Sequence, residues 1–258
     1  MSNILINRDK FTVTITLNRE EKLNALTKDM WQELGVKLTE LADDRDVRVI
    51  MITGAGERSF SPGNDIAEFE HQRSNRDQAR AYGAIMHSTL SALSECPFPT
   101  IARIRGICVG GGLEIAACCD IRICTADSRF GVPINQLGLV MAYPEISALQ
   151  KLVGYSRAAE ILFRGHIFSA QKALEMGIVN QITEDSEIDR VTNEIASEIA
   201  SGAPLVARWH KKFLKRLDSP EPLTTEELEE GFTCYDTEDF RIGTEAFLSK
   251  AKPDFVGR

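Results

Sequence analysis

The amino-acid sequence predicts an α/β fold that ends in a helical region. Short apolar segments alternate with amphipathic segments up to about residue 182, a pattern typical of strands and helices packed in layers. From residue 187 onward the pattern is helical only, in segments broken by prolines. The sequence therefore predicts a core at positions 1–200 followed by a helical region at positions 201–258.

The N-terminal part predicts a hairpin, a helix and a buried strand. Residues 4–6 and 11–17 read as two antiparallel strands, because the second alternates between apolar residues and threonines. Thr27 is expected to cap a helix that extends to Ala42. The segment 47–52 is continuously apolar, as in strands that are buried on both faces.

The middle of the chain adds further alternating elements. Apolar residues recur at helical spacing over positions 76–93. A strand, a glycine-rich turn, a helix and a second strand follow between Pro99 and Cys124. The remaining expected elements are a loop that opens at 130–133, helices at 145–152, 157–163 and 170–176, and a strand at 178–182.

The bulk composition limits the partners of this chain. Its formal net charge is −8, which makes it a poor general binder of nucleic acid or of anionic membranes. A basic cluster is expected to form a solvated helix face rather than an RNA site; it consists of Lys211, Lys212, Lys215 and Arg216. No apolar run reaches the roughly 18 residues that indicate a membrane helix.

The cysteines and histidines show no metal-binding pattern. None of the six cysteines forms a CxxC pair and most lie in apolar runs, so we expect buried free thiols in a reducing compartment. The four histidines lack the spacing of metal ligands. We therefore expect a cytoplasmic protein that holds no metal.

Two glycine turns are the strongest functional signal in the sequence. The turns at 61–65 and 109–112 each follow an apolar strand, and the second opens an apolar helix. Two such turns side by side would aim backbone N–H groups at one oxygen, as in an oxyanion hole. Glu114 lies in the first turn of that helix, either as a partner of the helix dipole or as a catalytic base.

Five segments in collinear order resemble the crotonase, or enoyl-CoA hydratase/isomerase, superfamily. The segments 60–66 and 110–114 are similar to its two oxyanion motifs. The other three are KLNAL at 22–26, ALEMGIVN at 173–180 and AFLSKAKPDFVG at 246–257. The resemblance implies a β-β-α spiral core with a C-terminal α-helical trimerisation region, and hence a homotrimer or a dimer of trimers.

The resemblance also implies an enzyme that binds an acyl-coenzyme A thioester and stabilises its enolate, as in fatty acid metabolism. By their place in the motifs, the backbone N–H groups of Asn64 and Gly111 would hold the thioester oxygen. Glu114 matches one of the two glutamates of the hydratases and would act as the general acid/base.

A second set of residues is implied along the coenzyme A part of the substrate. These are Ala25, Asp65 and Ile66, with Lys22 near the phosphates. Because coenzyme A belongs to the substrate, the resemblance implies no separate cofactor.

One position departs from the hydratase pattern. In hydratases a second glutamate follows the Phe-Gly-x-Pro turn, whereas this chain has Ile134 there. Glu145 and Tyr143 are the candidates for a second catalytic group, although a first-turn carboxylate and a pocket-lining ring are the favoured interpretations. We therefore expect isomerisation, or hydration with a single base, rather than two-glutamate hydration.

Two other functions stay open at this point. A decarboxylase or hydrolase on the same scaffold would also bind an acyl-CoA, but it would release CO2 or free coenzyme A. A non-catalytic binding protein, like the RNA-binding members of the superfamily, would need a strongly basic surface, which a net charge of −8 does not favour.

Overall fold

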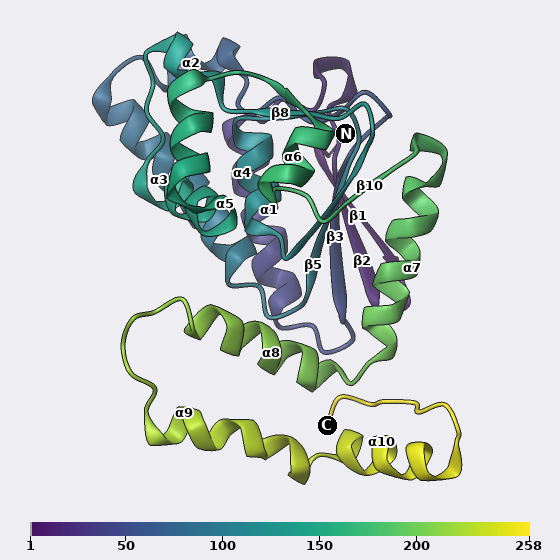
Figure 1. The fold of residues 1–258 in the computed structure, drawn as a ribbon. Coiled ribbons are helices and arrows are strands. Elements are labelled where there is room, and N and C mark those ends of the chain that lie inside the picture. Colours follow the sequence, from purple (N-terminus) through teal and green to yellow (C-terminus); the bar gives the residue numbers. More distant parts are fainter. Residues whose placement is uncertain (1) are drawn as a thin grey trace.

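Residues 2–258 of the computed structural model form two β-sheets with helices packed against them (Figure 1). The larger sheet has the strand order β1-β2-β3-β5-β7-β10. Its strands are β1 (Ile4–Asp9), β2 (Thr12–Leu17), β3 (Val49–Gly54), β5 (Thr100–Ile104), β7 (Ile121–Thr125) and β10 (Gln181–Thr183). Strand β1 is antiparallel to β2, and the other neighbouring pairs are parallel. The expected N-terminal hairpin and the α/β fold class are therefore confirmed.

A smaller sheet of short strands lies beside the larger one. Its order is β4-β6-β8-β9, with β4 (Ser59–Ser61), β6 (Ile107–Val109), β8 (Arg129–Gly131) and β9 (Phe168–Ser169). Strands β4, β6 and β8 are parallel, and β9 is antiparallel to β8. The expectation of a loop that opens at Phe130 is wrong, because Phe130 is fully buried and pairs with Cys108 in this sheet. Strands of two or three residues are too short to show an alternating pattern.

Helices cover both faces of the larger sheet (Figure 1). The main core contains residues of α1 (Lys28–Ala42), α3 (Arg76–Ser94), α4 (Gly111–Cys118), α5 (Tyr143–Arg164) and α6 (Ala170–Met176). The opposite face of the sheet packs against α7 (Ile188–Ser201). Thr27 caps α1 as expected, because its side chain accepts a hydrogen bond from Met30 N at 3.2 Å. No helix within residues 2–258 combines the length and the apolarity that crossing a bilayer requires.

Helix α5 contains a break at Gly154. The sequence predicts separate helices at 145–152 and 157–163, and the structure joins them in one element with Gly154 between them. The φ angle of Gly154 is +77°, which only glycine adopts without strain. The two expected helices are therefore present, with the direction of the chain changing at Gly154.

The C-terminal helices lie at one end of the molecule (Figure 1). They are α8 (Pro204–Arg216), α9 (Thr225–Glu230) and α10 (Glu238–Ser249). Lys211 ties α8 to the core, because its buried Nζ donates to Phe98 O at 2.8 Å and to Asp120 Oδ2 at 2.7 Å. The expectation of a solvated basic face is therefore wrong for Lys211. The other three cations of the cluster pair with Glu230, Glu95 and Glu227.

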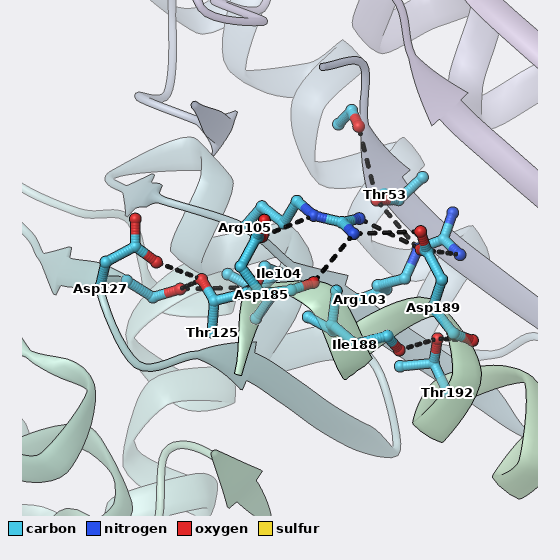
Figure 2. Close-up of polar contacts among 12 residues, drawn as sticks. Thr53, Arg103, Ile104, Arg105, Thr125, Asp127, Asp185, Ile188, Asp189 and Thr192 are labelled. Atoms are coloured by element: carbon cyan, nitrogen blue, oxygen red, sulfur yellow. Dashed lines mark hydrogen bonds and ion pairs between the residues drawn. The ribbon is translucent and has the colours of Figure 1, made fainter. Parts of the chain in front are cut away.

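An ion-pair cluster holds the start of α7 against the larger sheet (Figure 2). Arg105 pairs with Asp185 at 2.9 Å and with Asp189 at 3.0 Å. Arg103, on β5, pairs with the same Asp189 at 2.8 Å. Because Asp185 and Asp189 lie just before and within the first turn of α7, the cluster fixes this helix to the end of β5.

Candidate active site

The two glycine turns lie side by side because they follow neighbouring strands. Strands β4 and β6 are parallel, with Ser61 paired to Cys108, so both turns leave the same edge of the small sheet. Gly63 has a φ angle of +97°, and a Cβ atom there would lie 2.8 Å from the nitrogen of Gly111. A Cβ atom at Gly111 would lie 3.6 Å from the nitrogen of Asn64. The two backbones are therefore in contact, and a side chain at Gly63 would push them apart.

This packing leaves the N–H groups of Asn64 and Gly111 available. Leu26 bridges to the first turn: its N–H donates to Gly63 O and its carbonyl accepts from Asp65 N, each at 2.8 Å. The Asn64 N–H between them takes no part in that bridge. Gly111 is the first residue of α4, where N–H groups have no acceptor within the helix. The turns thus offer two donors at the positive end of a helix.

Trp31 supports both turns from the core. Its Nε1 donates to Asn64 Oδ1 at 2.7 Å, and its ring atom Cζ2 would lie 3.1 Å from a Cβ atom at Gly111. Asn64 Nδ2 lies 3.5 Å from Met86 Sδ on α3. The buried stripe of α1, which the sequence predicts from apolar spacing, therefore also orients the first turn.

Glu114 is a buried carboxyl group whose Oε2 has no hydrogen-bond partner among the described residues. It lies in the first turn of α4 and is 7% exposed. The pKa of Glu114 is raised to about 8, mainly by burial and also by the negative charge of Glu145, while the positive charge of Arg73 lowers it. A carboxyl group with a pKa near neutrality can both give and take a proton under physiological conditions.

Glu145 brings a second carboxylate towards Glu114 from another helix. It lies in the first turn of α5 and is buried. Its Oε1 is 3.0 Å from His87 Nε2, and its Oε2 accepts a hydrogen bond from Ala142 N at 2.5 Å. Glu145 therefore does cap its own helix, as the favoured interpretation says, and in addition it contacts His87 and acts electrostatically on Glu114.

Ile134 and Tyr143 add no polar group at this place. Ile134 lies in a 3₁₀ turn at 133–137 and packs against the main core. Tyr143 is 91% exposed. Tyr143 lies at the outer start of α5, while Glu145, two residues later, is buried, and a pocket-lining role for the Tyr143 ring stays a prediction.

Arg19 joins two of the residues expected along coenzyme A. Its Nη1 donates to Asp65 Oδ2 at 2.7 Å and to the carbonyl of Ala25 at 3.1 Å. This hydrogen-bonded ion pair lowers the pKa of Asp65, whose second oxygen caps the turn that follows. Lys22 and Ile66 are exposed in the same two loops. The loops are thus fixed to each other, with a cation and an apolar side chain facing solvent.

The family model described as Enoyl-CoA hydratase/isomerase matches residues 8–258. This chain belongs to the enoyl-CoA hydratase/isomerase family. It is 33% identical to a short-chain-enoyl-CoA hydratase of Clostridium acetobutylicum, over 98% of this chain and 97% of that protein. It is 31% identical to a crotonyl-CoA hydratase of Syntrophomonas wolfei, over 99% and 98% of the two chains.

Solved structures show the same fold for this enoyl-CoA hydratase/isomerase family member. A crystal structure described as an enoyl-CoA hydratase/carnithine racemase from Magnetospirillum magneticum has a TM-score of 0.98 and 43% identity, covering 100% of this chain and 97% of that one. An enoyl-CoA hydratase from Bacillus anthracis has a TM-score of 0.92 and 30% identity, covering 100% of both chains. The crotonase-type spiral core is therefore confirmed, and the chain is an enzyme of the lyase/isomerase type.

Three residues of the site in this family member have no counterpart in the sequence-based expectations. They are Arg19, which joins the two loops, Trp31, which supports the turns, and His87, which contacts Glu145. His87 directly follows Met86, one of the buried residues on the inner face of α3. That adjacency is the one sequence signal that indicates a place for His87 at the edge of the buried face.

Proposed function

We propose that this enzyme hydrates short-chain enoyl-CoA thioesters through an enolate held at the two glycine turns. The observation that carries the proposal is Glu114, a buried carboxyl group without a partner on Oε2 that lies in the same helical turn as Gly111. The substrate class is supported by two relatives, which are named short-chain-enoyl-CoA hydratase and crotonyl-CoA hydratase.

The two N–H groups would act on the thioester oxygen. In the enolate this oxygen carries negative charge, and hydrogen bonds from Asn64 N and Gly111 N become stronger as the charge develops. Trp31 and the contact between Gly63 and Gly111 hold these donors before the substrate arrives. Charge stabilisation therefore needs little rearrangement during the reaction.

The two carboxyl groups would share the proton transfers of hydration. As the oxygen of water bonds to the β-carbon, one of its O–H bonds breaks and Glu145 takes the proton. The double-bond electrons move to the thioester oxygen, and Glu114 then gives its proton to the α-carbon. The product is a 3-hydroxyacyl-CoA, formed by the net addition of one water. The second carboxylate that Ile134 does not supply would thus come from α5, so the proposal replaces the expected isomerisation or single-base hydration with hydration by two carboxyl groups.

Coenzyme A would bind along the loops that Arg19 joins. Lys22 is exposed where a phosphate can reach it, and Ile66 offers an apolar surface in the neighbouring loop. Ala25 and Asp65 would line the same path, with Asp65 kept ionised by Arg19. No separate cofactor takes part in this scheme.

The test is a panel of enoyl-, 3-hydroxyacyl- and malonyl-type CoA thioesters with the wild type and Glu114→Gln. The wild type should turn over a short-chain enoyl-CoA, and Glu114→Gln should lower kcat by about 10²–10⁴-fold, the usual effect of losing a general acid/base. Binding of the thioester should persist, because Gln keeps the shape of the side chain. Glu175→Gln on α6, an exposed glutamate, is the matched control and should keep wild-type turnover.

Three results would contradict the proposal. Release of CO2 or free coenzyme A as the main product would indicate a decarboxylase or hydrolase. A shifted double bond without any 3-hydroxyacyl product would indicate isomerisation. Full activity in Glu114→Gln together with its loss in Glu145→Gln would leave Glu114 as a partner of the helix dipole only.

A further inference from the structure

The two carboxyl groups of the site have opposite surroundings. Glu114 Oε2 has no hydrogen-bond partner among residues 2–258. Both oxygens of Glu145 are hydrogen-bonded, one to His87 Nε2 at 3.0 Å and the other to Ala142 N at 2.5 Å. Both residues are buried to the same extent, at 7% exposed. Burial alone therefore does not distinguish them, and the difference lies in the donors around Glu145.

Donors around a carboxylate favour its ionised form, whereas burial without donors favours the neutral form. Two neighbouring carboxyl groups with such different surroundings divide into an acid and a base. When Glu145 is ionised it can only accept hydrogen bonds, and the proton in its contact with His87 Nε2 then belongs to the imidazole. In the proposed hydration, Glu114, whose Oε2 has no donor, is therefore the acid, and Glu145, whose two oxygens have donors, is the base.

We propose that His87 is a positioning residue that orients Glu145 for proton abstraction by donating its Nε2–H to Oε1. The inference rests on the proposed function, since it assigns a partner to the second carboxylate of the same site. His87 comes from α3 and Glu145 from α5, so the pair also joins two helices that both contact α4, which carries Glu114. The other charged group whose effect reaches this place is Arg73, at the end of α2 (Phe69–Gln72).

The proton balance is compatible with this role. In the first step Glu145 gains the proton that water loses, and in the second step Glu114 loses its proton to the α-carbon. The pair is therefore left with Glu145 protonated and Glu114 ionised, and one proton must move to restore the starting state. The side chain of His87 is 31% exposed, so the Glu145 end of the site is within reach of solvent for this exchange.

Two substitutions at His87 test whether it acts as a hydrogen-bond donor or only through packing. Gln places an amide N–H where Nε2 lies, whereas Leu fills space without a donor. His87→Leu should lower kcat on the short-chain enoyl-CoA by about 10–100-fold, as expected for losing a hydrogen bond to a charged group, with little change in KM. His87→Gln should recover most of that loss. His166→Leu, at an exposed histidine outside the site, is the matched control and should keep wild-type kcat.

A double substitution tests whether His87 acts through Glu145. Adding His87→Leu to Glu145→Gln should cause no further loss of kcat, because the group that His87 orients is already gone. Additive losses would overturn the inference, as would wild-type kcat in His87→Leu or equal losses in His87→Leu and His87→Gln. Thermal melts show whether each variant is folded. If His87→Leu does not fold, His87→Gln still tests the inference.

Failure of the proposed function would look different. In that case the wild type itself would form no 3-hydroxyacyl-CoA from the enoyl-CoA thioesters of the panel, and the inference would fall with the function on which it rests. If the wild type is active but His87→Leu and His87→Gln lose equal amounts of kcat, the inference about His87 is overturned and the proposed function is not.

Discussion

At the residue scale, the buried carboxyl group of Glu114 lowers the stability of the fold at neutral to alkaline pH. We propose that the same group takes part in catalysis. Its pKa in the folded protein, about 8, lies above the ordinary value of 4.5, so the folded state holds this proton more tightly than the unfolded chain does. The stability linked to Glu114 is therefore fully present below about pH 4.5 and is lost as the pH rises through about 8. A residue that weakens the fold at neutral to alkaline pH is consistent with a functional site.

This linkage predicts how the free energy of unfolding of Glu114→Gln compares with that of the wild type. Between pH 5 and pH 9, stability should fall more in the wild type than in the variant, because glutamine has no proton to lose. Each pKa unit corresponds to about 1.4 kcal/mol, so the difference should be measurable by denaturant unfolding at the two pH values. Parallel changes in the two proteins would mean that Glu114 does not titrate as a buried group.

The sequence indicates Glu114 and names Glu145 as a candidate second group, but it does not indicate that Glu145 meets His87, for a physical reason. Glu114 follows Gly111 by three residues in one helical turn, so local spacing is enough to place it beside the glycine turn. His87 and Glu145 are 58 residues apart and meet only because α3 and α5 both pack around α4. The place of Glu145 in the site therefore depends on the packing of the helices, which local patterns do not determine.

At the element scale, the length of a strand or helix decides whether its period can be recognised in the sequence. Strands β1, β2 and β3 and helices α1 and α3 are long enough to show their periods, and the structure has them close to the expected places. The strands of the small sheet have two or three residues each and show no period. The adjacency of the two glycine turns follows from that sheet, so composition and periodicity did not predict it; the resemblance to the family did.

The contact between the turns predicts a large effect of Gly63→Ala. An added Cβ would lie 2.8 Å from Gly111 N, at a φ of +97° that alanine rarely adopts. The turns should separate, and kcat should fall by about 10²–10³-fold, as for the loss of an oxyanion-hole donor, with a lower melting temperature. Gly231→Ala is the control, because a Cβ there meets nothing within 4 Å. Equal, small effects of both substitutions would count against the proposed hole.

At the scale of the whole molecule, the C-terminal helices expose large apolar side chains. Phe247 is 84% exposed, and Leu214, Phe232 and Leu248 are also exposed on the same region of the chain. Exposed apolar surface of this extent is typical of an interface between subunits. The division into a core and a C-terminal region, and the assembly as a homotrimer or a dimer of trimers, stay predictions.

The assembly can be tested at Phe247. Sedimentation at micromolar concentration should show a trimer or a larger species for the wild type, and Phe247→Asp should shift it towards the monomer, because a charge in an apolar interface is costly to desolvate. Val36→Asp, at an exposed apolar residue of α1, is the control and should leave the assembly intact. A monomeric wild type would rule out the predicted assembly.

Asp120 gives the helix that carries Glu114 a second point of attachment. Helix α4 begins at the glycine turn and ends at Cys118, and two residues later Asp120 Oδ2 accepts hydrogen bonds from Thr100 and from Lys211 of α8. Glu114 lies four residues before Cys118, the last residue of the helix, so only about one helical turn separates Glu114 from the end that is tied to α8. We therefore expect any event that moves α8 to change the catalytic rate as well as the stability.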